Sequence, residues 1–394
     1  MNRDVLHLLA ESRPAHLDPT APVPVRTRQA ELGMALAGAR QARRRGLRAV
    51  RPVWAAGGLA GVAAATAIAL AVSGTTPRAP DTRTASPGRS GEVRLTASQV
   101  FLAAAGSSAR SKAGSGAYWA TETESAIYFQ VGTAKKYVVA DREQGWNSTA
   151  RSPKSTSWFV SKSLGAHPAT PADEAAWKAD GSPSTWQAEF KVPARPGSKP
   201  GAAKKLQLTT ASKPSFGNPS NLGPYVFDLV GKNVTVKEVM ALPSTEKALR
   251  DRLLQGYHGH DTESDLPMAR DPWLFRVTAD LLANMPVSPA TRAAAYQILA
   301  HINGTRALGR ITDPLGRSGE AVAFAESDAT GLERQIVVDT GTGLLLSDQE
   351  AVHRQALNYP WAKPGTVVSY NAVVKAGWTD AAPVKPEHTY PTRG

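Results

Sequence analysis

Hydrophobic residues occur in strand-like runs in two stretches of the chain, one on each side of a helical region. The first stretch is rich in aromatic and β-branched residues and predicts strands at 117–131, 136–146 and 156–165. The second stretch predicts a meander of strands at 307–313, 320–327, 333–339, 344–352 and 366–374. Turns such as Asp313–Gly316 and Thr340–Gly343 separate these strands, and strands joined by turns this short are antiparallel.

Helical signals precede the first strands and fill the region between the two groups. Thr96 and Gln99 form a capping-box pattern that predicts a short helix ahead of Val100. Three further helices are expected from their capping and helix-ending residues: one from Ser244 to Gly256, one that starts at Asp271-Pro272, and one from Ser288-Pro289 to Asn303-Gly304. Together, these elements predict an α+β domain with a large curved antiparallel sheet and helices on one side.

One polar segment between the two groups of strands reads as an insertion. Residues 193–224 hold five prolines after Pro193, and they are predicted to form a surface loop. That loop would carry the lysines Lys199, Lys204, Lys205 and Lys213.

An uncharged segment near the amino terminus has the length of a membrane span. Residues 53–72 contain twenty residues without a charge, and as a helix they extend over about 30 Å, the thickness of a bilayer core. The apolar and interfacial side chains of this predicted transmembrane helix include Val53, Trp54, Leu59, Val62, Ile68, Leu70 and Val72. A cleaved signal peptide ending near Ala71-Val72-Ser73 and a buried core helix are the alternatives.

Charge asymmetry orients this predicted span. Residues 1–52 hold ten arginines and four acidic residues, which is +6 of the chain's net charge of +13. Six of these arginines directly precede the span: Arg40, Arg43, Arg44, Arg45, Arg48 and Arg51. The positive-inside rule therefore places the amino terminus in the cytoplasm and the carboxy-terminal domain outside the plasma membrane.

The complete predicted organisation has five parts. They are a cytoplasmic arm at 1–52, the span at 53–72, a flexible linker at 73–94, the α+β domain at 95–380 and a tail at 381–394. The arm is either a disordered tail or a pair of short helices that become ordered on a partner. Its apolar residues at helical spacing would form the partner face: Val5, Leu8, Leu9, Leu32 and Leu36.

Composition removes several classes of function. The absence of cysteine excludes disulfides, thiolate metal sites and a cysteine nucleophile. The basic balance would suit nucleic acid, but from Glu92 onward the net charge is only about +5 and no nucleic-acid-binding module is recognisable. We therefore expect the basic arm to lie at a membrane, and no nucleic-acid partner.

Three sets of residues could carry chemistry or binding. His258, His260, Asp261, Glu263 and Asp265 offer metal-ligand types at short spacing, although a solvated loop between helices also collects such residues. Glu122 and Glu124 would share one face of a strand, as in a paired-carboxylate glycosidase or on an ordinary polar face. A concentration of tryptophans could line a groove or fill a core: Trp119, Trp146 and Trp158, with Trp177 and Trp186.

Four segments together, 9–19, 249–265, 286–323 and 333–352, resemble an uncharacterised family of actinobacterial membrane proteins. The resemblance implies a cytoplasmic arm, one span and an extracytoplasmic domain without enzymatic activity, often encoded beside an extracytoplasmic-function sigma factor. The order of strands and helices in the outer domain is also similar to the half-barrel of lipoprotein carriers. Zinc-type anti-sigma factors carry a His/Cys motif, which a chain without cysteine lacks.

These observations predict a single-pass membrane protein that binds an envelope lipid or protein and needs no enzyme activity, metal or cofactor. The arm would pass the signal to a sigma factor or another cytoplasmic partner. The alternative is a lipid or lipoprotein carrier, and an envelope hydrolase that uses Glu122 and Glu124 or the His258 cluster ranks third.

Overall fold

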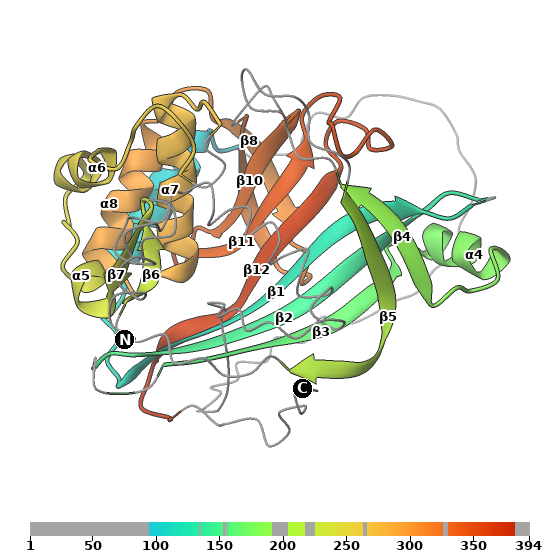
Figure 1. Ribbon diagram of the computed structural model, residues 1–394. Coiled ribbons are helices and arrows are strands. Elements are labelled where there is room, and N and C mark those ends of the chain that lie inside the picture. Colours follow the sequence, from blue (N-terminus) through green and yellow to red (C-terminus); the bar gives the residue numbers. More distant parts are fainter. Residues whose placement is uncertain are drawn as a thin grey trace, which may run out of the picture.

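The computed structural model describes residues 94–133, 135–152, 155, 157–190, 204–216, 225–262, 266–325 and 330–382 (Figure 1). The arm, the span at 53–72, the linker up to residue 93 and the tail from residue 383 lie outside this range. Within the described residues, no helix combines the length and the apolar character needed to cross a membrane.

The predicted α+β class is confirmed, with ten strands in one antiparallel sheet. Their order is β4-β5-β3-β2-β1-β12-β11-β10-β9-β8. The strands are β1 (Tyr118–Val131), β2 (Tyr137–Ala150), β3 (Trp158–Pro168), β4 (Thr185–Phe190), β5 (Lys204–Phe216), β8 (Arg306–Thr312), β9 (Ser318–Phe324), β10 (Leu332–Asp339), β11 (Leu344–Val352) and β12 (Val367–Thr379). The last strand, β12, pairs with both β1 and β11 and so joins the two predicted groups in one sheet.

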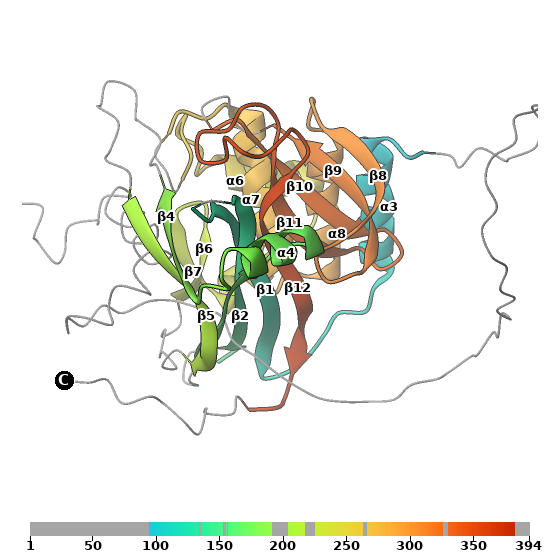
Figure 2. The same ribbon diagram turned by 90° about the vertical axis from the view of Figure 1, so that its right-hand side faces the viewer.

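Helices and a small hairpin pack on one face of this sheet (Figures 1 and 2). The helices on this face are α3 (Ala97–Arg110), α5 (Val236–Met240), α6 (Glu246–Leu254), α7 (Arg270–Asn284) and α8 (Pro289–Ala300), and the hairpin is β6 (Tyr225–Leu229) with β7 (Lys232–Thr235). The predicted capping box is present, since Thr96 and Gln99 exchange hydrogen bonds. Ser288 caps α8 as predicted, whereas α6 is preceded by Thr245 rather than capped by Ser244.

The sheet curves around the face that the helices cover. Residues opposite one another in antiparallel strands share a face, so Val322 and Ile336 lie together, and both pack against the helices. At the far edge, β4 contacts β1 although three strands separate them in the sheet order. Trp186 of β4 packs there on Phe129 and Val139, beside the short helix α4 (Pro171–Ala179). The concave face therefore carries an apolar cluster at each end.

Polar residues occupy the concave face between these two clusters. One cross-strand row runs through Ser163, Glu143, Ser125, Asn371 and Asp348. A salt bridge closes the end of this row that lies nearest the helices: Arg334 pairs with Asp348 and with Asp280 of α7. The middle of the curved sheet is thus hydrophilic.

The prediction of a surface loop at 193–224 is wrong for residues 204–216. These residues form β5, which pairs with β3 and β4. Lys204 and Lys205 therefore lie in a strand. Lysine and proline in this segment obscured an alternation in which Leu206 and Leu208 join the apolar cluster beneath β4.

Candidate functional site

Strands β11 and β12 part from each other at one end. They pair from Ser347 opposite Ala372 to Ala351 opposite Val367. Beyond Ser347, β11 pairs with β10, and beyond Ala372, β12 pairs with β1. We call the separated segments, residues 344–346 and 373–379, the fork.

An extra residue in each strand marks the start of the fork. In β11, Ser347 faces Val337 and Leu345 faces Val338, so Leu346 is the extra residue of a bulge. In β12, Val373 faces Thr123 and Lys375 faces Glu122, which leaves Val374 as the extra residue. A bulge bends its strand and increases its twist. Two bulges at the same level therefore turn the two strands away from each other.

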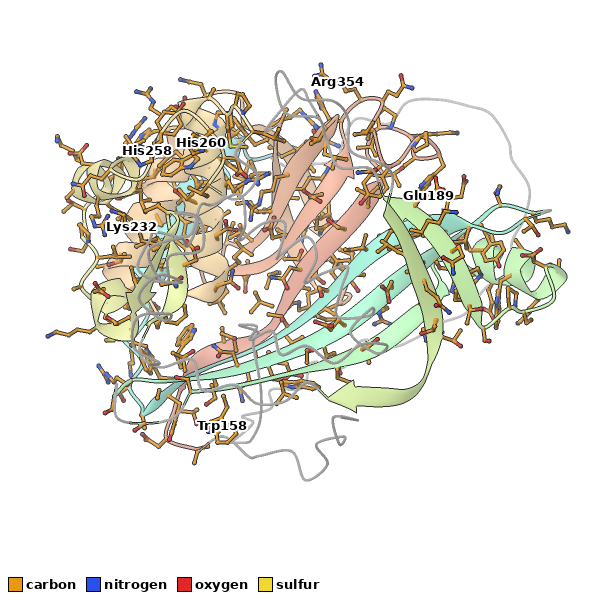
Figure 3. All side chains as sticks on the ribbon, viewed as in Figure 1. Trp158, Glu189, Lys232, His258, His260 and Arg354 are labelled. Carbon is orange, nitrogen blue, oxygen red and sulfur yellow. The ribbon has the colours of Figure 1, made fainter. Side chains whose placement is uncertain are left out.

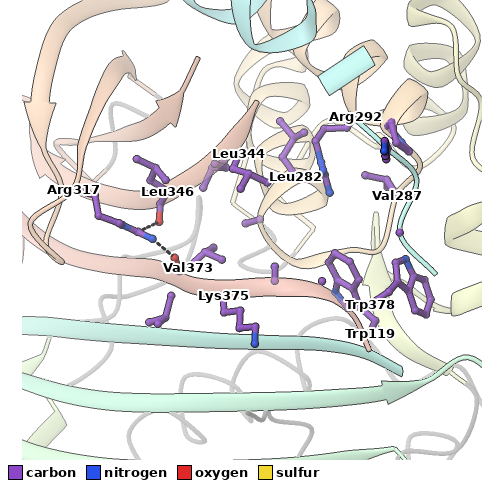
Figure 4. A pocket seen from close by; sticks show the side chains of 18 residues that line it. Trp119, Leu282, Val287, Arg292, Arg317, Leu344, Leu346, Val373, Lys375 and Trp378 are labelled. Carbon is purple, nitrogen blue, oxygen red and sulfur yellow. Dashed lines mark hydrogen bonds between the residues drawn. The ribbon is translucent and has the colours of Figure 1, made fainter. Parts of the chain in front are cut away.

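Arg317 joins the two strands at the closed end of the fork. Its guanidinium donates to the carbonyl of Leu346 at 2.7 Å and to that of Val373 at 2.5 Å (Figure 4). The Asp313 carboxylate, which is fully buried, accepts two more bonds from the same guanidinium at 2.6 and 2.9 Å. This arginine thus replaces the strand pairing that the bulges interrupt.

A pocket of about 240 Å³ lies in the fork, between the sheet and the helices (Figure 4). The lining residues are Lys112, Gly114, Trp119, Leu282, Ala283, Val287, Pro289, Arg292, Arg317, Leu344, Leu345, Leu346, Val373, Val374, Lys375, Ala376, Gly377 and Trp378. Four of these residues are basic and none is acidic. The pocket therefore combines an apolar wall with positive charge.

Arg292 is the basic group that the fold satisfies least. It points from α8 toward the fork (Figure 4), and its Nε atom is buried without a hydrogen-bond partner in the part of the chain that the structure describes. Burial lowers the pKa of this guanidinium, and this effect outweighs the neighbouring Tyr296 hydroxyl, which raises the pKa. The side chain stays charged because an arginine pKa is so high. A buried N–H group without an acceptor favours a ligand that supplies one, and the positive charge of the guanidinium favours an anion.

Two aromatic residues form the end of the pocket wall at the helices. The rings of Trp119 and Trp378 meet edge to face with centroids 5.6 Å apart. Trp119 also donates from its indole nitrogen to the carbonyl of Asn284 at 3.2 Å. On the other side, Leu344 and Val374 are 43% and 40% exposed. The pocket thus has a fixed inner wall and an apolar mouth open to solvent.

The predicted tryptophan groove does not form. Trp119 lies on the concave face with Trp378, but Trp146 pairs with Glu122 and Trp158 with Ser148, and all four of these residues face the convex side. Figure 3 shows Trp158 at the margin of the sheet. Trp177 and Trp186 pack at the far end, beside Phe129. Strand alternation separates residues that are merely close in sequence.

The carboxylates of Glu122 and Glu124 share the convex face, as strand alternation requires. Glu124 is buried, and it accepts hydrogen bonds from Arg142 at 2.5 Å and from the Tyr370 hydroxyl at 2.9 Å. The hydrogen bond and burial raise the pKa of Tyr370, with burial the larger cause. Glu124 thus belongs to a polar cluster that ties β1 to β2 and β12.

The histidine cluster lies at the helical end of the molecule (Figure 3). The rings of His258 and His260 are 6.3 Å apart, while buried Asp261 pairs with Arg276 at 3.0 Å. Glu263 and Asp265 are outside the described residues. Over the ranges that the structure covers, no group of three or more histidine and acidic residues is arranged to hold a metal ion.

Of the residues that line the pocket, only Trp119 is a candidate from the sequence, although Arg292 and Arg317 also carry a signal. Arg292 falls on the apolar stripe of its predicted helix, three residues before Ala295 and seven before Leu299. Arg317 follows Asp313 by four residues across a predicted turn. The two bulges have no counterpart in the hydrophobic pattern.

No protein-family profile matches this chain, and no curated protein is significantly similar to it in sequence. The family resemblance described above therefore stays a prediction. The predicted span and partner-face residues lie outside the described part of the chain.

Proposed function

We propose that this protein is a membrane-tethered, extracytoplasmic binding protein whose ligand carries a negative charge on an apolar body. The fork pocket is the binding site in this proposal. The observation that carries it is the Nε atom of Arg292, which is buried without a hydrogen-bond partner among the described residues, in a pocket with four basic and no acidic lining residues. The apolar wall would hold the body of the ligand, and Arg292 would bind its anionic end.

The remaining parts of the proposal concern topology and signalling. The segment 53–72 would anchor the chain in the plasma membrane with residues 1–52 in the cytoplasm. The arm would report occupancy to a cytoplasmic partner, and a sigma factor is the partner that the family resemblance implies. This sensor function needs no enzymatic step.

Binding can be tested on the full-length chain with three probes of the same length: dodecanoate, its methyl ester and dodecyltrimethylammonium. Tryptophan fluorescence, to which Trp119 and Trp378 in the pocket wall contribute, follows binding, and calorimetry gives the affinity. We expect dodecanoate to bind at least tenfold more tightly than the ester and the cation. Equal affinities for the three probes, or no binding of dodecanoate or any other anionic probe, would refute the proposed function.

The relay can be tested through the predicted partner face. Full-length chain with Leu32→Asp and Leu36→Asp should lose capture of a sigma factor encoded beside it, because charge on the apolar stripe opposes helix docking. A matched control is Leu102→Asp, which changes an exposed residue of α3. Equal capture by all variants, or no capture by the unmodified chain, rejects the relay.

A lipid or lipoprotein carrier remains the second candidate. The curved sheet with helices on its concave face favours this function. The polar row through Glu143, Ser125 and Asn371 opposes it, because an acyl chain laid across the sheet would remove these polar groups from water. Mass spectrometry of lipids extracted from the purified full-length chain distinguishes the two, since a carrier retains apolar cargo.

A further inference from the structure

Along the fork, each of the two strands pairs with a neighbouring strand on its outer side, and within the described residues its inner edge pairs with no strand. Residues 373–377 of β12 have β1 as their partner on one side, and residues 344–346 of β11 have β10. Within the described chain, no strand lies between them. Open strand edges bind further backbone donors and acceptors. Arg317 already uses this property, since it donates to the carbonyls of Leu346 and Val373.

The size of the pocket limits what can enter it. Its 240 Å³ is smaller than the roughly 300–1,000 Å³ typical of sites that enclose a whole ligand. Only one end of a longer ligand therefore fits. The rest of the ligand would leave through the mouth, past the exposed side chains of Leu344 and Val374.

The charge and the polar groups of the site together determine which chemical group at the end of a ligand can bind. The charge of Arg292 and its unsatisfied Nε atom favour an anion, while the two open edges favour groups that both donate and accept hydrogen bonds. A fatty acid supplies the anion but leaves the edges without partners. The carboxy terminus of a polypeptide supplies a carboxylate and a backbone that pairs as a strand.

On the basis of the binding function proposed above, we propose that the ligand is the carboxy-terminal end of an extended polypeptide. Its last residues add as a short strand in the fork, and its terminal carboxylate binds Arg292. Apolar side chains at alternate positions would face Leu282 and Val287 on the helix side and Leu344 and Val374 on the other.

Two matched libraries of acetylated pentapeptides test this assignment on the full-length chain. Both end in leucine, valine or phenylalanine, one with a free carboxylate and one with a carboxamide. We expect at least tenfold stronger retention of the free acids. N-methylation of the last two amides should reduce binding at least tenfold, because it removes strand hydrogen bonds. Equal retention of acids and amides, or unchanged binding after N-methylation, overturns the proposal.

Two variants locate the effect. Arg292→Met should abolish the preference for the free acid while the thermal midpoint of unfolding stays within a few degrees. Arg310→Met, which changes an exposed arginine of β8, should leave the preference for the free acid unchanged. Peptide binding by Arg292→Met with an unchanged preference for the free acid places the peptide elsewhere and overturns the assignment.

Dodecanoate separates failure of this inference from failure of the proposed function. If dodecanoate binds and the free-acid peptides do not, the fork binds a lipid acid and the peptide assignment is wrong. If neither dodecanoate nor any peptide binds, both the peptide assignment and the proposed binding function are wrong.

Discussion

Strands β11 and β12 form a β-ladder at one end, with a register shift between Glu350 and Ala351, and are separated by a ligand-sized gap at the other end. In the paired part, five consecutive residues of β11 face β12. In the fork, one extra residue in each strand ends the ladder, and the side chain of Arg317 takes the place of the lost pairing. A sheet can therefore gain a pocket without a long insertion, through two single-residue bulges and one arginine.

Deleting Val374 should produce the largest change, because it removes one of the two bulges. Residues 375–379 would shift by one position, and every side chain among them would move to the opposite face. Trp378 would then leave Trp119. We expect the free energy of unfolding to fall by more than about 3 kcal/mol, the usual cost of removing a large core side chain.

Urea unfolding and near-ultraviolet circular dichroism measure the effect of this deletion. The tryptophan signal should lose intensity together with stability. An unchanged spectrum and unchanged stability would mean that the bulge does not set the direction of β12.

Arg317→Ala should have the second-largest effect. It removes the connection between Leu346 and Val373 and leaves the Asp313 carboxylate buried without its main partner. Loss of one member of a buried ion pair costs roughly 3–5 kcal/mol, and we expect about 3 kcal/mol here because the arginine is one-third exposed. Arg310→Ala, at an exposed position of β8, is the matched control, and comparable destabilisation by both would contradict a special role for Arg317.

Asp339→Asn should have the smallest effect, and it should depend on pH. Burial opposes the charge of Asp339, but hydrogen bonds from Thr342 and from the backbone of Gly341 outweigh it and hold the pKa below its usual 3.8. The ionised form therefore stabilises the turn above pH 3.8, and this stability is lost as the pH falls through the lowered folded-state pKa.

Thermal unfolding at pH 7 and at pH 3 tests this prediction. The asparagine variant should be less stable than the unmodified chain at pH 7, by about 1 kcal/mol or less. The difference should shrink at pH 3. A difference that grows on acidification has the opposite sign and would show that Asp339 is not stabilised as an anion.

Much of the fold could be predicted from local patterns. The capping box at Thr96 and the Ser288-Pro289 start of α8 are set by neighbouring residues, so the sequence reveals them directly. The meander of strands follows from alternating apolar positions. Residues 204–216 were mistaken for a loop because their lysines and prolines are typical of loops, while the pairing of β5 with β4 and β3 depends on distant residues.

The site was less accessible to prediction, for a physical reason. One bulge arises from the register between β1 and β12, which lie far apart in the sequence, and the other from the register within the hairpin of β10 and β11; neither register is visible in the hydrophobic pattern. The register between β1 and β2 places Trp119 and Trp146 on opposite faces although both belong to predicted strands. Local signals exist only for Arg292, a charge on an otherwise apolar helix stripe, and for Arg317, which follows Asp313 by four residues across a turn.

Hydrogen exchange of backbone amides, measured on the full-length chain with and without dodecanoate, tests the central claim most directly. The fork should be the binding site, so exchange should slow in segments that contain residues 344–346 and 373–377. The Arg292→Met variant should show no such slowing. Protection confined to β4 and β5, or equal protection in the Arg292→Met variant, would show that the fork is not the binding site.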